Sequence, residues 1–338
     1  MSPLPFIIFL PVRNGGNYIR QAVASIMAQS DPNWQLVVLE NQSTDATGDF
    51  LAALKDPRIE IVSSDEPLDI CDNWHRAWQW LETNDLNEAL VTTIGHDDYF
   101  DPRFIEVMRR LADVHPSATL YQAAFNLIDS QGTLIRPCKP IPDTETWQGF
   151  AAALCWSVRD SYGTGYVFRA GDYRRVGGIP HFPKLLYADH LLFIRLARLG
   201  HKRATEELLC SYRLHGGSAS SGLTGTTLNA YVEALDRFVE KLRGEMADFV
   251  ESISGRNALS CLIARQIVSL GNPSVRPLLT QDNKDRIDAF KILFAMLSPE
   301  VSLETWAEAR GSRSVRHLER LIQAVSLARV RWRERKAS

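Results

Sequence analysis

The sequence contains no apolar run that could cross a membrane and almost no excess charge of either sign. A membrane-spanning helix needs at least about 18 consecutive apolar residues, and no run in the 338-residue chain approaches this length. Basic residues number 38 and acidic residues 40, a net charge of -2, which gives no electrostatic reason to expect nucleic-acid binding. The apolar run at residues 6–10 has no preceding basic residue and no following cleavage site, so it predicts a buried strand rather than a secretion signal.

Cysteine is scarce, and two nucleotide-binding signatures are missing. The five cysteines are odd in number and form no Cys-x-x-Cys pair, which predicts reduced thiols in a cytosolic chain. No Gly-x-Gly-x-x-Gly follows the first apolar run, where the sequence reads Arg13-Asn14-Gly15-Gly16, and no Walker A lysine motif occurs. Classical dinucleotide binding and P-loop chemistry are therefore disfavoured, although the planar guanidinium of Arg13 suits a diphosphate.

Apolar runs and amphipathic segments alternate through the first half of the chain. Hydrophobic residues make up 45% of the chain and charged residues 23%, as in soluble globular proteins, and the length suggests about two domains. Strands are expected at residues 6–10, 34–39, 59–62 and 89–94, and helices at residues 17–29, 44–54, 71–82 and 189–199. This alternation predicts right-handed βαβ units and an α/β fold with a parallel sheet, followed by helices from about residue 226 onward.

Polar side chains follow the expected strands, at the edge of an α/β sheet where ligands bind. The adjacent carboxylates of Asp97 and Asp98 come after the fourth strand, and a divalent cation such as Mg²⁺ or Mn²⁺ would offset their mutual repulsion. The alternative is a helix cap, because Asp101 followed by Pro102 is a good N-terminal signal. That alternative accounts for Asp101 but not for Asp97.

Three other polar residues have both a functional and a structural interpretation. Glu40 ends the second strand and could bind a ribose or a base, but its spacing alone favours a solvated strand end. Asp189 opens an apolar helix, where the helix dipole keeps a carboxylate ionised; this suits a catalytic base and equally a cap. His215 precedes two glycines, and a lone histidine is more often a structural hydrogen-bonding group than a ligand.

Taken together, the order of these segments resembles the family 2 glycosyltransferases, which have a GT-A fold. The resemblance extends over about residues 6–218, and no single motif carries it. The matching segments are Phe9-Leu10-Pro11-Val12-Arg13-Asn14, Leu39-Glu40-Asn41-Gln42-Ser43-Thr44-Asp45, Asp72-Asn73-Trp74-His75-Arg76-Ala77, Gly95-His96-Asp97-Asp98, Ala188-Asp189-His190-Leu191 and Tyr212-Arg213-Leu214-His215. The sequence departs from the family pattern where Gly95 and Ala188 replace acidic residues and where Glu40-Asn41-Gln42 replaces an aspartate-rich turn.

The resemblance implies a Rossmann-like, mostly parallel sheet flanked by helices, and a role for each matching residue. It implies that Asp189 is the catalytic base and that Asp97 binds Mg²⁺ or Mn²⁺, with His215 as a second ligand. It also implies a donor site, whose expected residues are Pro11, Arg13, Asn14, Glu40, Asn73, Arg76, Asp97 and Asp98.

The expected activity is inverting transfer of a sugar from a nucleotide-diphosphate sugar, with UDP as the expected nucleotide. The acceptor would be a hydroxyl of a saccharide or lipid-linked molecule, as in cell-surface polysaccharide synthesis. The alternative is a catalytically silent nucleotide-sugar or carbohydrate-binding protein with the same fold, which the loss of acids at Gly95 and Ala188 favours.

The expected domains are a catalytic domain at residues 1–220 and a helical region at residues 226–338. Residues 306–338 hold eight arginines and one lysine against three glutamates, with apolar residues at helical spacing. This segment could contact anionic lipid on the inner face of the membrane, or it could pack on the catalytic domain or on a partner subunit. A cytoplasmic enzyme, in part peripheral to the membrane, is therefore expected.

Overall fold

The computed structural model describes residues 5–215, 224–270, 272–273 and 275–306, and these group into two compact units. The first unit comprises Met1–Trp147, Ser161–His181 and Asp189–Ser218, and the second comprises Gln148–Asp160, Phe182–Ala188 and Ala219–Ser338. Two short segments from the middle of the chain therefore group with the C-terminal helices, and nothing in the sequence pattern indicated this.

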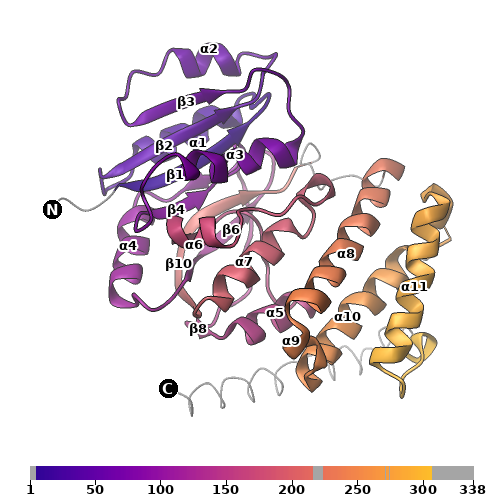
Figure 1. Ribbon diagram of the computed structural model, residues 1–338. Helices are drawn as coiled ribbons and strands as arrows, with labels where there is room; N and C mark the ends of the chain where they lie inside the picture. Colours follow the sequence, from indigo (N-terminus) through magenta and orange to yellow (C-terminus); the bar gives the residue numbers. More distant parts are fainter. Residues whose placement is uncertain (1–4, 216–223, 271, 274, 307–338) are drawn as a thin grey trace. The chain divides into compact units, whose positions relative to one another are not determined.

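A single sheet forms the centre of the first unit (Figure 1). Its strand order is β3-β2-β1-β4-β9-β6-β10-β5, with β7 beside β6 and β8 beside β10. The strands span Phe6–Val12 (β1), Trp34–Glu40 (β2), Ile59–Ser63 (β3), Leu90–Thr93 (β4), Tyr99–Phe100 (β5), Leu120–Ile128 (β6), Leu134–Pro137 (β7), Thr144–Glu145 (β8), Tyr166–Arg169 (β9) and Lys202–Arg213 (β10).

The sheet is mixed, with a parallel half that matches the expectation. β3, β2, β1 and β4 are parallel neighbours, and the register places Val12 of β1 opposite Glu40 of β2. β9 then enters between β4 and β6 and runs antiparallel to both, whereas β6 and β10 are parallel. The α/β class with a mostly parallel sheet and flanking helices is confirmed, and the antiparallel β9 is an addition that the expectation did not contain.

Helices cover both faces of the sheet. In the first unit the helices span Tyr18–Met27 (α1), Thr47–Ala52 (α2), Ile70–Glu82 (α3), Phe104–Val114 (α4), Ala170–Arg175 (α6) and, except for its first residue, Ala188–Arg198 (α7). The helix Trp147–Cys155 (α5) groups, except for its first residue, with the second unit. On one face, Ile8 and Leu10 of β1 share a buried cluster with Ile19 of α1 and Phe104 of α4. On the other face, Phe9 of β1 makes an edge contact with Trp80 of α3. Burial on both faces explains why the strands read as continuous apolar runs.

Helix starts follow local capping chemistry, with one correction. Asp69 caps α3, because its carboxylate accepts a hydrogen bond from the backbone of Asp72. The expected cap at Asp101 is wrong in position: α4 begins at Phe104, and the Asp101 carboxylate accepts the Arg103 backbone N–H before the helix starts.

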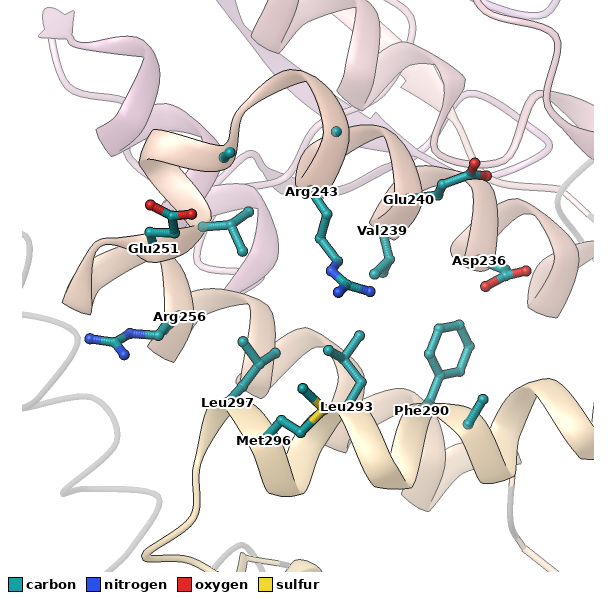
Figure 2. A pocket seen from close by; sticks show the side chains of 14 residues that line it. Asp236, Val239, Glu240, Arg243, Glu251, Arg256, Phe290, Leu293, Met296 and Leu297 are labelled. Carbon is teal, nitrogen blue, oxygen red and sulfur yellow. The ribbon is translucent and has the colours of Figure 1, made fainter.

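The second unit is helical, as expected for the described residues beyond 224. Its helices span Gly225–Glu245 (α8), Ala247–Glu251 (α9), Ile253–Leu270 (α10) and Gln281–Leu297 (α11). A cavity of about 820 Å³ lies among α8, α9 and α11 (Figure 2), with Phe290 and Leu293 on its apolar side and Arg243 and Glu240 on its charged side. Within the described residues, no helix combines the length and apolarity needed to span a bilayer.

Candidate functional site

The loops after β1 and β2 are tied together by polar side chains. Asn14 has a left-handed backbone (φ 55°), which asparagine tolerates well, and its side-chain oxygen accepts the backbone N–H of Thr44 at 2.7 Å. Its own backbone N–H donates to Ser43 Oγ at 3.0 Å. The Glu40 carboxylate accepts the backbone N–H groups of Gln42 and Ser43 at 3.1 and 2.6 Å. Asn14 and Glu40 therefore shape the rim of the strand-end site, whereas Arg13 is exposed.

Two more of the expected donor-site residues brace the strand ends. Asn73 donates to the Leu39 carbonyl at 3.3 Å. Arg76 donates to Asn73 Oδ1 at 3.0 Å and to the Glu40 and Val62 carbonyls at 2.9 and 2.6 Å. Their polar groups thus hold β2, β3 and α3 together. Pro11 lies buried within β1, paired with Leu39 of β2.

Asp97 and His215 come together at the end of the sheet, although 118 residues separate them. His215 Nε2 lies 2.7 Å from Asp97 Oδ2, and the two side chains are 15% and 19% exposed. His96 is close to both, and its burial is the main cause that lowers the pKa of this imidazole, against the opposing charge of Asp97. The structure therefore joins the two residues expected to bind a cation.

Asp98, by contrast, faces the protein interior. It is 2% exposed; one carboxylate oxygen accepts the Arg213 backbone N–H at 2.9 Å and the other accepts the Thr164 hydroxyl. Burial, with the nearby Asp97 charge, raises the pKa of Asp98 well above its ordinary value. In this structure a donor would meet Asp98 only after these bonds had opened.

Asp189 lies in the first turn of α7, where the sequence placed it. Burial raises the pKa of the Tyr212 phenol, and the charges of Asp98, Asp97 and Asp189 act in the same direction. Asp97 and Asp189 thus influence one side chain, Tyr212, which stacks on Tyr162 at 4.0 Å between ring centroids. Both carboxylates belong to the first unit.

The sequence pattern predicted no individual role for four residues of this region, which are Tyr212, Arg213, Thr164 and His96. Tyr212 and Arg213 belong to the run that ends in His215, so their proximity to it was a usable signal. Thr164 carried no such signal, because its partner Asp98 is 66 residues away in the chain.

The side chains of Asp97 and His215 could supply part of the coordination shell of a divalent cation. Asp97 supplies a carboxylate oxygen and His215 an imidazole nitrogen, a donor set that suits Mn²⁺ and, less well, Mg²⁺. The described residues contain no group of three or more histidine, cysteine or acidic side chains that could hold a metal ion. The cavity of Figure 2 contains none of the expected site residues.

Comparison with known proteins identifies one family over the first part of the chain. Residues 7–154 match the family model for Glycosyl transferase family 2. A putative teichuronic acid biosynthesis glycosyltransferase, TuaG of Bacillus subtilis (strain 168), is 36% identical over 67 residues, which are 19% of this chain and 26% of TuaG. The uncharacterized protein y4gI of Sinorhizobium fredii (strain NBRC 101917 / NGR234) is 27% identical over 117 residues, which are 33% of this chain and 12% of y4gI. The matches thus span about a quarter or less of these relatives.

Solved structures show the same architecture over more of the chain. Residues 1–349 of S. aureus TarS, in complex with UDP-GlcNAc, superpose with a TM-score of 0.67 at 13% identity, covering 99% of this chain and 93% of that one. The same TarS fragment without that ligand in its description gives a TM-score of 0.62 at 14% identity, covering 99% and 92%. At these identities the likeness concerns the fold. Residues 7–154 thus resemble glycosyl transferase family 2, and the chain shares its fold with the superposed TarS structures.

Proposed function

We propose that this chain is an inverting glycosyltransferase that moves a sugar from a nucleotide-diphosphate sugar to a hydroxyl group. We propose a UDP-sugar as donor and a saccharide or lipid-linked acceptor, as in cell-surface polysaccharide synthesis. The names of TuaG and of the TarS complex support this direction. The observation that carries the proposal is the Asp97–His215 pair at 2.7 Å.

The donor is expected to lie across the ends of β1, β2 and β4. The loops that Asn14 and Glu40 shape would form its nucleotide pocket, and the exposed Arg13 can pair with the diphosphate oxygens. Asp97 and His215 would hold Mg²⁺ or Mn²⁺, which when bound would offset charge on the diphosphate leaving group. In this proposal the pocket is supported by four residues that do not contact the donor, which are Pro11, Asn73, Arg76 and Asp98.

Asp189 would act as the base on the acceptor. The acceptor oxygen forms a bond to the anomeric carbon while the bond from that carbon to the diphosphate breaks, so the configuration inverts. A carboxylate is a weak base toward a free alcohol, but the hydroxyl becomes acidic as it bonds to the anomeric carbon, and its proton then passes to Asp189. Positioning of the two substrates must therefore supply most of the rate increase.

A silent binding protein with the same fold remains the competing proposal, and two residues favour it. Gly95 and Ala188 stand where the family pattern has acids, and Ala188 is fully buried. An active transferase and a silent binding protein would both bind the donor, but only the transferase would turn it over.

The Asp189→Asn variant tests the proposal directly. We expect it to release UDP from UDP-GlcNAc, with water as the acceptor, at least about 100-fold more slowly than the wild type. Binding of UDP in the presence of Mn²⁺, measured by calorimetry, should change little. A variant with the wild-type rate would remove Asp189 from the mechanism, and a wild type that binds UDP but never turns over the donor would favour the silent protein.

A further inference from the structure

Arg213 is a buried arginine at the end of β10, two residues before His215. It is 2% exposed, yet among the described residues its guanidinium group donates to carbonyl and amide oxygens and to no carboxylate. Its side chain donates to four oxygens, which are Asp97 O at 2.9 Å, Asp129 O at 3.1 Å, Ser130 O at 3.3 Å and Gln21 Oε1 at 2.7 Å. With its donors directed at the protein, the guanidinium has little left to offer a ligand.

These oxygens belong to three segments that are distant in the sequence. Asp97 is in the loop after β4, Asp129 and Ser130 are in the turn between β6 and β7, and Gln21 is in α1. The guanidinium carbon also lies 4.5 Å from the centre of the Tyr18 ring, and the Tyr18 hydroxyl donates to the Ser130 carbonyl at 3.1 Å. One side chain therefore joins the start of α1, the β6–β7 turn and the loop that carries Asp97.

Arg213 donates two hydrogen bonds to the loop after β4, one from its side chain and one from its backbone. The Arg213 side chain donates to the Asp97 carbonyl, and the Arg213 backbone N–H donates to the buried carboxylate of Asp98 at 2.9 Å. The end of β10 is thus fixed against residues 97 and 98 at two points. Because His215 follows on the same strand end, these bonds also fix the distance from its ring to Asp97.

We propose that Arg213 is a positioning residue, which sets the geometry of the Asp97–His215 pair toward the donor diphosphate without touching the donor itself. This inference rests on the proposed function, since it assigns a purpose to the pair. A lysine cannot replace this arginine, because one ammonium group cannot reach acceptors on three sides of a planar fork. The arrangement, rather than the positive charge, is what the site requires.

The experiment compares Arg213→Lys and Arg213→Met with a matched pair at Arg109. Arg109 is also largely buried, and it bonds Asp31 and the Asn33 carbonyl at 2.8 and 2.9 Å, at the opposite end of β2. The measurements are the melting temperature, the binding of UDP with Mn²⁺ by calorimetry, and hydrogen exchange of the amides at residues 95–98.

Both Arg213 variants should weaken Mn²⁺-dependent UDP binding by about 10- to 100-fold, as loss of a supporting hydrogen bond typically does at a metal site. The amides at residues 95–98 should exchange faster in both. The Arg109 variants should lower the melting temperature while leaving binding and this exchange as in the wild type. Wild-type exchange at residues 95–98 in the Arg213 variants, or an equal loss of binding in the Arg109 variants, would overturn the inference.

A milder variant keeps the test decisive if the Arg213 variants do not fold. Gln21→Leu removes one acceptor from an exposed position of α1 and should raise exchange at residues 95–98 and weaken binding by a few-fold. Unchanged exchange in this variant would count against the inference. Asp97→Asn, measured in parallel, separates the two proposals: if it binds UDP and Mn²⁺ as the wild type does, the proposed donor site fails, whereas the exchange data still decide the role of Arg213.

Discussion

At the scale of single residues, Gly95 explains one departure from the family pattern. A Cβ atom built on Gly95 would lie 2.6 Å from Asp97 Oδ1 and 3.6 Å from Asp98 Oδ2. The Asp97 carboxylate therefore occupies the space that a side chain at position 95 would need. The absence of an acidic side chain at position 95 is therefore what allows the Asp97 carboxylate to take its observed position.

The Gly95→Ala variant should consequently displace Asp97 from His215. We expect Mn²⁺-dependent UDP binding to weaken by about tenfold, because the pair loses its alignment. Gly48→Ala is the matched control, since it lies in α2 with no atom within 4 Å of a new Cβ, and it should leave binding unchanged. Calorimetry on the two variants checks this, and equal affinities would show that the pair tolerates the added methyl group.

Four histidines should make the stability of the folded protein decrease as the pH falls. Burial is the largest cause lowering the pKa values of these residues, His75, His96, His115 and His201. In the unfolded chain they titrate near about 6.5, so below this pH the unfolded state binds more protons and the folded state loses stability. The melting temperature should therefore fall between pH 7.5 and pH 5.5.

Asp98 opposes this trend. Its raised pKa means that the folded state takes up a proton more readily than the unfolded state, so its contribution to stability grows as the pH falls. The Asp98→Asn variant should therefore lose stability on acidification more steeply than the wild type. Thermal melts at several pH values would measure both slopes, and a melting temperature that rises toward pH 5.5 in the variant would refute the assignment.

At the scale of elements, one buried ion pair joins β8 to β10. Lys202 Nζ donates to Glu145 Oε2 at 2.6 Å, and the two side chains are 0% and 5% exposed. Lys202→Met should lower the free energy of unfolding by about 3–5 kcal/mol, because Glu145 is left charged and buried. Lys202→Met combined with Glu145→Leu should restore most of this loss.

Urea unfolding measures these changes. The exposed pair Arg103–Glu207, with side chains 57% and 36% exposed, provides the control, and Arg103→Met should cost less than about 1 kcal/mol. If Lys202→Met were as mild as Arg103→Met, the buried pair would contribute no more than a surface one.

The elements that the sequence predicted well are those with a local signal. β1 and β2 are apolar runs, and they form within one or two residues of the expected ranges. β9 was not foreseen, because residues 166–169 become a strand only through pairing with β4 and β6, which are distant in the sequence. Long-range pairing leaves no periodic trace along the chain.

The candidate site likewise has parts that a local sequence signal predicted and parts that it did not. The sequence correctly placed polar residues at the strand ends, but it could not tell which side chains face a ligand and which face the backbone. Glu40 and Arg76 hold main-chain groups here. Arg213 escaped assignment because three of its four acceptors are backbone carbonyls, which any residue provides.

At the scale of the whole molecule, the basic segment at residues 306–338 lies, apart from Trp306, outside the described residues. Its sequence alone predicts attraction to anionic lipid, at about 1 kcal/mol per basic residue near the surface. The full chain should therefore sediment with phosphatidylglycerol vesicles at low salt and less so at high salt. Replacing Arg329, Arg331, Arg333 and Arg335 with glutamate should abolish this, while phosphatidylcholine vesicles serve as the control. Equal sedimentation with both lipids would exclude an electrostatic attachment.

The two short segments that group with the C-terminal helices affect the order in which a newly made chain can fold. In the second unit, Tyr187 bonds the Tyr231 hydroxyl at 2.8 Å, and Arg265 bonds the Trp156 carbonyl at 3.3 Å. These partners leave the ribosome dozens of residues after the segments that need them. Synthesis must therefore run well past residue 218 before residues 148–160 and 182–188 can reach their final places. Until then the apolar side chains of these two segments lack their final packing partners, and apolar surface that is exposed in this way favours aggregation.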